Sequence, residues 1–256
     1  ALSLSTLSVG THLLQMTVSN DADGLCQNSI NYSVEEAEPI IDPIISADHD
    51  AIFANIDISQ DGSTVYVTRV FHSDVLALST TDLSLISIIS VSGDTSEIKL
   101  SVDGTRAWVP INSSPGKMDI IDTDPQSASY HSVIGTVQYS GNGGTGVGIH
   151  PGGTEVYGLT QRPAPGAIHL IPASSSSYSQ TLTPVSGVNA LLYDGAFSSD
   201  GSKAYFSIWQ SDHASNLVIV STATLSITGY LDLQIPHTVG GPGSMVSVEH
   251  SNGEQL

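Results

Sequence analysis

A glycine in a tight turn is followed, four residues later, by an aromatic residue at four places in this chain. The four pairs are Gly62 and Tyr66, Gly104 and Trp108, Gly153 and Tyr157, and Gly201 and Tyr205. Successive glycines lie 42, 49 and 48 residues apart. Self-similarity at such a period is the signature of a repeat protein, and it constrains the fold more than any single motif does.

Each repeat contains four segments with the composition of β-strands. An Asp-Gly or Gly-Gly dipeptide followed by an alternating apolar run predicts the turn and second strand of a β-hairpin. The first strands of these hairpins are expected at 52–59, 96–102, 144–150 and 193–199, and the turns with their second strands at 60–68, 102–110, 151–159 and 199–207. Two further strands follow in each repeat, at 75–79 and 85–91, 118–122 and 132–137, 168–172 and 180–185, and 217–221 and 226–233.

Four strands in a repeat of this length favour a β-propeller. A single four-stranded sheet cannot bury both of its faces, whereas sheets packed radially cover one another and leave only short edges. Solenoid repeats are shorter or helical, and no ten-residue window here shows helical apolar periodicity. We therefore predict an all-β fold built from four-stranded antiparallel blades, with a closed form of seven blades.

The repeat starts again near the C-terminus. Asn252-Gly253 takes the place of the Asp-Gly turns, and Leu256 aligns with Val65. Propellers close with about four to eight blades. We therefore expect four blades and the beginning of a fifth, in a propeller that continues beyond residue 256.

A separate hairpin is predicted before the first repeat, from alternating apolar residues in 10–19 and 25–34. Its buried face is expected to carry Leu14, Met16, Val18, Cys26, Ile30, Tyr32 and Val34. Two strands do not make a stable domain by themselves. We therefore interpret 1–36 as the last strands of an Ig-like β-sandwich that begins before residue 1, 37–44 as an acidic linker with proline, and 45–256 as the propeller.

The frame SQDGSTVYVTR, which ends in Tyr66-Val67-Thr68-Arg69, resembles the repeat of the YVTN β-propellers, in which an Asp-Gly turn leads into Tyr-Val-Thr-Asn. The later turn of that repeat is echoed by IIDTDPQ at 120–126 and VSTATLS at 220–226, whereas the other three blades diverge to AWVP, VYGL and AYFS. The hairpin at 10–34 resembles the last strands of bacterial Ig-like or PKD-like modules. These resemblances imply a large, exported, multidomain surface protein.

The charge of the chain excludes polyanionic partners. It carries 25 acidic residues against 6 Lys plus Arg, a net charge of −19, while nucleic acids and anionic membranes require a basic surface. No apolar stretch of 18 residues exists, so this segment is not expected to insert into a membrane. We expect an extracellular or cell-surface protein whose partners are other surface proteins, glycans or copies of itself.

Few residues have the spacing of a metal or modification site. None of the nine histidines makes a metal-ligand spacing with another, and no cofactor is expected. Carboxylate oxygens suit calcium, and two acidic groups are candidates for it, Asp21 with Asp23 and Asp119 with Asp122 and Asp124. Neither completes a twelve-residue calcium loop, and Asp is also an ordinary turn former. Asn31 and Asn112 begin glycosylation sequons.

Two functional classes remain open. The first is a non-catalytic scaffold, adhesion or surface-assembly module, which includes layer and filament subunits. The second is a propeller enzyme of lactonase or quinoprotein-dehydrogenase type, because propellers related to this repeat place such sites at the central channel. No catalytic residue is assigned from the sequence. A convergent cluster of carboxylate, His and Arg around a channel pocket favours the enzyme, and a lining of Ser, Gly and Val favours the scaffold.

Overall fold

A computed structural model describes residues 10–19, 25–34, 52–95, 97–162, 166–183, 190–210, 213–235, 248–250 and 253–255. Contacts divide the chain into two units, Ala1–Asp42 and Pro43–Leu256. The described part of the first unit is the antiparallel pair β1 (Gly10–Ser19) and β2 (Leu25–Val34), in which Leu14 pairs with Ile30. The predicted hairpin is therefore confirmed, while the linker at 37–44 and the candidates Asp21 and Asp23 lie outside the described residues.

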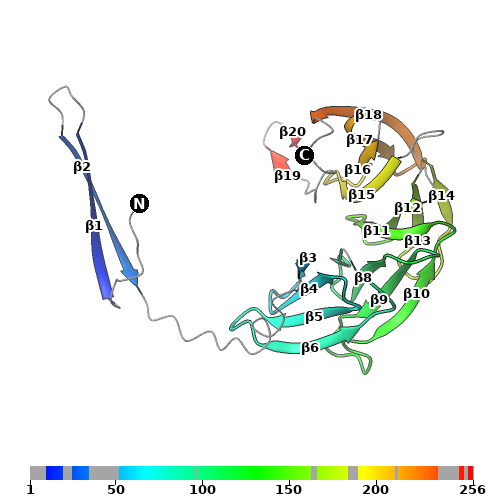
Figure 1. The fold of residues 1–256 in the computed structure, drawn as a ribbon, viewed down its shortest axis with the longest axis horizontal. Helices are drawn as coiled ribbons and strands as arrows, with labels where there is room; N and C mark the ends of the chain where they lie inside the picture. Colours follow the sequence, from blue (N-terminus) through cyan, green and yellow to red (C-terminus); the bar gives the residue numbers. More distant parts are fainter. Residues whose placement is uncertain are drawn as a thin grey trace. The chain divides into compact units, whose positions relative to one another are not determined.

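Four antiparallel sheets of four strands each make up residues 52–235, and in every sheet the strands are adjacent in chain order (Figure 1). The first blade contains β3 (Ile52–Ile58), β4 (Thr64–Val70), β5 (Asp74–Ser79) and β6 (Leu85–Ser90). The second contains β7 (Lys99–Leu100), β8 (Arg106–Ile111), β9 (Lys117–Asp122) and β10 (Val133–Gln138). The third contains β11 (Asn142–Ile149), β12 (Glu155–Arg162), β13 (Ala167–Pro172) and β14 (Gln180–Leu182). The fourth contains β15 (Ala190–Phe197), β16 (Lys203–Gln210), β17 (His213–Ser221) and β18 (Ser226–Ile235).

The four sheets follow one another around a common centre. Figure 1 shows β11 and β15 near this centre, while β6, β10, β14 and β18 form the outer rim. Contacts between blades run through the inner strands, with β3 against β7, β7 and β8 against β11, and β11 and β12 against β15. This radial arrangement confirms the predicted class of antiparallel propeller blades.

A further short hairpin, β19 (Val248–His250) and β20 (Gly253–Gln255), pairs His250 with Gly253. It agrees with the hairpin expected around that glycine. The intervening residues 251 and 252 lie outside the described part of the chain.

The turn glycines take the backbone conformation that the sequence predicts. Gly62 has φ +72°, and Gly104, Gly153 and Gly201 each have φ +70°. Residues with a Cβ are disfavoured in this left-handed region, which explains why the position is glycine in every blade.

The aromatic residue fills the interface with the next blade in three of the four pairs. Tyr66 packs among Ile98 and Ala107 of the second blade, and Trp108 against Val147 and Val156 of the third. Each is at most 1% exposed. Burial of such a large apolar surface is the main force that holds neighbouring sheets together.

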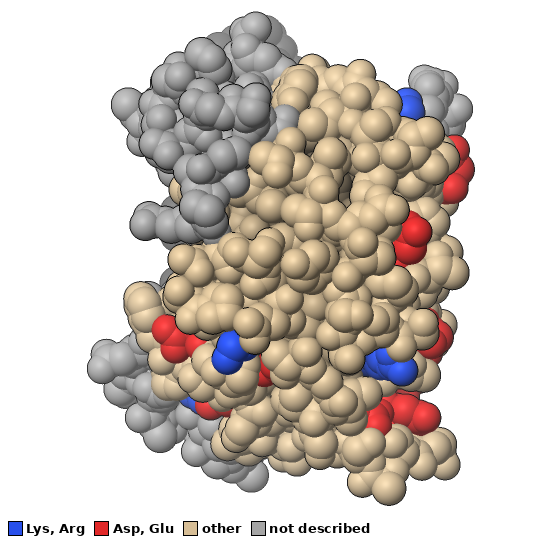
Figure 2. Space-filling view, turned by 90° about the vertical axis from the view of Figure 1, so that its right-hand side faces the viewer, with Lys and Arg blue, Asp and Glu red and all other residues tan. Residues whose placement is uncertain are grey.

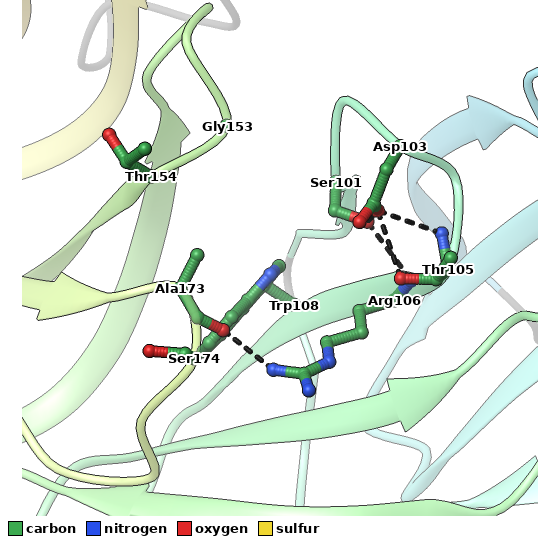
Figure 3. A pocket seen from close by; sticks show the side chains of 9 residues that line it. All are labelled: Ser101, Asp103, Thr105, Arg106, Trp108, Gly153, Thr154, Ala173 and Ser174. Atoms are coloured by element: carbon green, nitrogen blue, oxygen red, sulfur yellow. Dashed lines mark hydrogen bonds between the residues drawn. The ribbon is translucent and has the colours of Figure 1, made fainter.

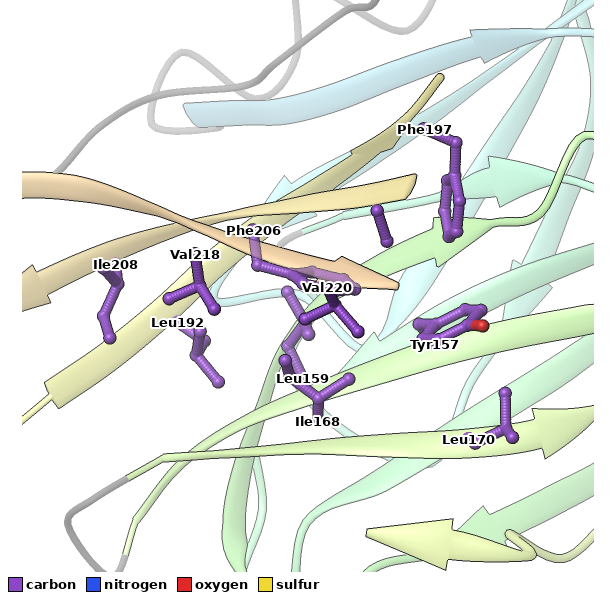
Figure 4. Packing of buried hydrophobic residues seen from close by; sticks show 11 residues of the cluster. Tyr157, Leu159, Ile168, Leu170, Leu192, Phe197, Phe206, Ile208, Val218 and Val220 are labelled. Carbon is purple, nitrogen blue, oxygen red and sulfur yellow. The ribbon is translucent and has the colours of Figure 1, made fainter. Parts of the chain in front are cut away.

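The third interface is built in the same way around Tyr157, which packs beside Phe197 and Phe206 of the fourth blade (Figure 4). Tyr205 differs because it is only half-buried. Its neighbours Ala204 and Phe206 face the third blade, so strand alternation turns Tyr205 to the opposite face of its sheet.

Candidate functional site

Three of the four blades carry a polar side chain near the centre at one position of the repeat, seven residues before the turn glycine. The residues at this position are Asn55, Glu97, Gly146 and Asp194. Sequence reasoning missed this group, although the shared offset from the turn glycine was a signal that could have found it. Glu97 and Asp194 are 4% and 3% exposed, so two carboxyl groups are buried at the centre.

Glu97 connects three blades. Its Oε2 accepts the N–H of Val147 in the third blade at 2.9 Å, and its carboxyl group interacts with that of Asp194 in the fourth. Lys99 Nζ lies 3.7 Å from Glu97 Oε1 and 4.0 Å from Asp194 Oδ1. The intervening repeat position is Gly146, where a Cβ would lie 2.0 Å from the Tyr193 carbonyl oxygen. Only glycine lets β11 and β15 approach so closely.

The surroundings of Glu97 disfavour its charged form. Burial, followed by the charge of Asp194, raises the pKa of Glu97 well above its usual value, against the opposing effects of Lys99 and the Val147 N–H. Lys99 Nζ is too far from Glu97 Oε1 for a hydrogen bond, and no other described residue forms one to this atom. The neutral form of Glu97 is therefore favoured, and two like charges are not forced together in the interior.

The candidate calcium residue Asp119 is buried in β9 and is used within the fold. Its Oδ2 accepts the N–H of Ser92 at 2.6 Å, and its Oδ1 accepts the hydroxyl of Thr136 at 2.7 Å. These donors occupy the oxygens that a calcium ion would need.

Asp122 is also occupied by internal donors. Its Oδ2 accepts the hydroxyls of Ser127 and Ser129, each at 2.5 Å, and its Oδ1 accepts the N–H of Asp124. Asp119 and Asp122 are three residues apart in a strand, so they lie on opposite faces. Among the described residues, no three His, Cys, Asp or Glu side chains come together as a metal-binding group.

The two predicted glycosylation sites, Asn31 and Asn112, lie in or beside β-strands. Asn112 is exposed just after β8, whereas Asn31 lies in β2, whose side chains are not described.

His150 lies just before the turn that contains Gly153. Its Nδ1 accepts the N–H of Gly152 at 3.0 Å, which leaves Nε2 to donate to the carbonyl of Gly201, also at 3.0 Å. This ring therefore joins the turns of the third and fourth blades.

A cavity of about 400 Å³ lies between the turns of the second and third blades (Figure 3). Hydroxyl side chains, one guanidinium and one carboxylate surround it. The lining residues are Ser101, Asp103, Thr105, Arg106, Trp108, Gly153, Thr154, Ala173 and Ser174. Arg106 Nη1 donates to the Ala173 carbonyl at 2.6 Å, across the boundary between the blades.

A second cavity, of about 230 Å³, draws on all four blades at the end opposite the turn glycines. Its lining residues are Val70, Phe71, Asp94, Thr95, Asn112, Thr145, Gln161 and Tyr193. Amide and hydroxyl groups predominate there, with a single carboxylate. Neither Glu97 nor Asp194 lines this cavity or the one between the turns.

Comparison with known proteins supports the architecture. No protein-family model matches the chain, and no curated protein matches it in sequence. A solved structure, Kuenenia stuttgartiensis hydrazine synthase, is similar with a TM-score of 0.62 over 70% of this chain and 48% of that chain. The fold is that of β-propeller blades. At 16% sequence identity the likeness shows the fold alone, and the match spans less than half of the hydrazine synthase chain.

Membrane insertion by a helix finds no support in the described residues, because none of them forms a helix with the length and hydropathy of a transmembrane span.

Proposed function

We propose that this chain is a non-catalytic structural or binding module of an exported surface protein, built from YVTN-type blades that follow an Ig-like module. The observation that supports this most is the burial of the two central carboxyl groups, those of Glu97 and Asp194. Glu97 and Asp194 contact backbone and one another, and they do not line the described cavities.

These polar contacts link each blade to the next. Asp57 Oδ2 in the first blade accepts the N–H of Leu100 in the second at 2.7 Å, and Glu97 continues the series into the third and fourth. A catalytic acid must come within hydrogen-bond reach of its substrate, and neither carboxyl group lines a described cavity that could hold one. The central carboxyl groups therefore serve to fix the radial packing.

The surface suits partners without strong charge. Figure 2 shows few Lys, Arg, Asp and Glu residues on one face, several of them as neighbours of opposite charge, and most of the described area there is uncharged. Together with the net charge of −19, this favours other surface proteins, glycans or further copies of the chain as partners at the cell surface. No cofactor forms part of the proposed function.

The enzyme alternative depends on the cavity shared by all four blades. Its polar lining contains one carboxylate, Asp94, and no Lys, Arg or His among its lining residues. Acid–base or hydrolytic chemistry needs a metal ion or a pair of titratable groups with different pKa values in the cavity. This lining favours the binding module over the enzyme.

Surface exposure tests the proposal. An antibody raised against residues 52–235 is applied to intact and to lysed cells of the organism that produces the protein, with a cytoplasmic protein as control. Labelling of intact cells supports the proposal. Labelling that appears only after lysis contradicts it.

A further inference from the structure

Three of the four blades close their turn with a threonine. The hydroxyl of this residue, just after the third strand of the blade, donates to the carbonyl of the turn glycine at 2.6–2.8 Å. The pairs are Thr80 with Gly62, Thr123 with Gly104, and Thr222 with Gly201. In the third blade this position is Ala173. Its N–H donates to the Thr154 carbonyl, just as the Thr123 N–H donates to the Thr105 carbonyl in the second blade, so the two positions are equivalent.

The missing threonine coincides with an enlarged cavity. The space beside Gly153 and Ala173 measures about 400 Å³, against about 210 Å³ for the equivalent space beside Gly104 and Thr123. Alanine offers no hydroxyl to the Gly153 carbonyl. The cavity therefore gains both volume and a hydrogen-bond acceptor on its wall.

The same cavity contains a buried donor that no described residue pairs. Trp108 is 0% exposed, and its Nε1–H has no hydrogen-bond partner within the described part of the chain. The equivalent aromatics are satisfied, since the Tyr66 hydroxyl lies 3.1 Å from His131 Nε2 and the Tyr157 hydroxyl donates to Glu155 at 3.0 Å. Figure 3 shows the nitrogen-bearing edge of Trp108 turned toward the space between the two turns. A buried donor left unpaired is unfavourable, and a bound acceptor removes that cost.

The charges of the cavity balance one another. Arg106 is fixed by the Ala173 carbonyl, so its guanidinium stays at the wall with further N–H groups to donate. The Ser101 hydroxyl and then the Thr105 N–H lower the pKa of Asp103, which remains ionised beside Arg106. A cavity with one positive and one negative group, in a chain of net charge −19, does not select an anion.

We propose that this cavity binds one sugar residue of a neutral glycan. Sugar hydroxyls both donate and accept, so one ring matches the Trp108 and Arg106 donors as well as the Gly153 and Asp103 acceptors. The rim adds the hydroxyls of Thr154 and Ser174. This site gives the proposed binding function its ligand class and rests on that function.

Nuclear magnetic resonance tests the site directly. The chain has two tryptophans, so the indole N–H region contains two signals, and the Trp209→Phe variant assigns the signal of Trp108. The probes are methyl glycosides of glucose, galactose, mannose and N-acetylglucosamine, with sodium acetate as the anionic comparison. We expect at least one glycoside to shift the Trp108 signal saturably and to leave that of Trp209 in place.

Substitutions at the threonine position provide matched variants. Ala173→Thr restores the missing hydroxyl and fills the cavity, and is expected to weaken glycoside binding by about tenfold or more, the equivalent of about one hydrogen bond. Thr123→Ala opens the equivalent space in the neighbouring interface and is the control, with unchanged affinity. Both changes are small and lie at turns, and circular dichroism verifies that each variant is folded.

Three results overturn the proposal. They are no response of the Trp108 signal to any glycoside, a response to acetate alone, and equal binding by wild type and Ala173→Thr. Surface labelling of intact cells with no glycoside response refutes this site and leaves the proposed module intact. Glycoside binding by a protein that is labelled only after lysis refutes the module's location and leaves the site intact.

Discussion

Replacing the turn glycines with alanine separates backbone strain from steric crowding. Gly62 and Gly201 have nearly equal φ, +72° and +70°, so both substitutions place a Cβ in the left-handed region. That conformation costs about 1–2 kcal/mol for a residue with a Cβ, and the lower entropy of the unfolded alanine chain returns about 0.4–1 kcal/mol. The backbone contribution is therefore about 1 kcal/mol at either site.

The surroundings of the added methyl group differ between the two turns. At Gly62 a Cβ meets nothing within 4 Å, so the backbone contribution is the whole effect. At Gly201 the Cβ would lie 2.6 Å from His150 Nε2, the atom that donates to the Gly201 carbonyl. Displacing the ring also breaks this hydrogen bond, worth about 1 kcal/mol, and its edge contact with Phe197. We expect Gly201→Ala to cost about 2–3 kcal/mol and Gly62→Ala about 1 kcal/mol.

Urea unfolding followed by circular dichroism measures both losses as shifts of the midpoint at constant slope. Gly62→Asn is the matched control, because asparagine tolerates the left-handed region better than alanine, and it is expected to lose less stability than Gly62→Ala. Equal losses at the two glycines would refute the steric argument. No loss for Gly62→Ala would refute the assignment of strain to the turn.

Three further predictions concern buried groups. The pKa of Glu97 is raised, so the folded state keeps a proton that the unfolded chain has released above about pH 4.5. Glu97→Gln is therefore expected to be more stable than wild type at pH 7, and urea unfolding should show that this difference disappears below pH 4.5. Burial lowers the pKa of His169 to about 4, so acidification from pH 6.5 to 4 protonates His169 in the unfolded chain first and removes up to about 3 kcal/mol of stability. His169→Gln is expected to abolish this loss of stability between pH 6.5 and 4. Tyr157→Ala, which empties the interface of the third and fourth blades, is expected to cost about 3–5 kcal/mol, and a loss under 1 kcal/mol would contradict the packing.

The strands were predictable because their signals are local. Alternation of period two and a glycine at positive φ act over a few residues, and the observed strands fall within a few residues of the expected ranges. The exception is the segment 96–102, where β7 spans only Lys99–Leu100. Just before it, Thr95 forms an isolated bridge to Ile111, and Glu97 bonds the third blade. Contacts to another blade replace part of the ladder there.

The sites were not predictable in the same way, because they depend on residues brought together from different repeats. Glu97 meets Asp194 only when the blade between them contributes a glycine at the same position. The expected grouping of Asp119 with Asp122 ignored the strand, which separates them to opposite faces. Ala173 was visible as a departure from threonine, yet its meaning required knowing which carbonyl the other threonines bond.

The contact between Glu97 and Asp194 has a consequence for unfolding. In an array whose units touch only their neighbours, each unit opens with a probability set by its own stability and two interfaces. The contact between the Glu97 and Asp194 carboxyl groups joins the second and fourth blades directly and so adds a term that skips one unit. Amide hydrogen exchange in the second, third and fourth sheets should therefore report a more cooperative opening than contacts between neighbouring blades alone would produce.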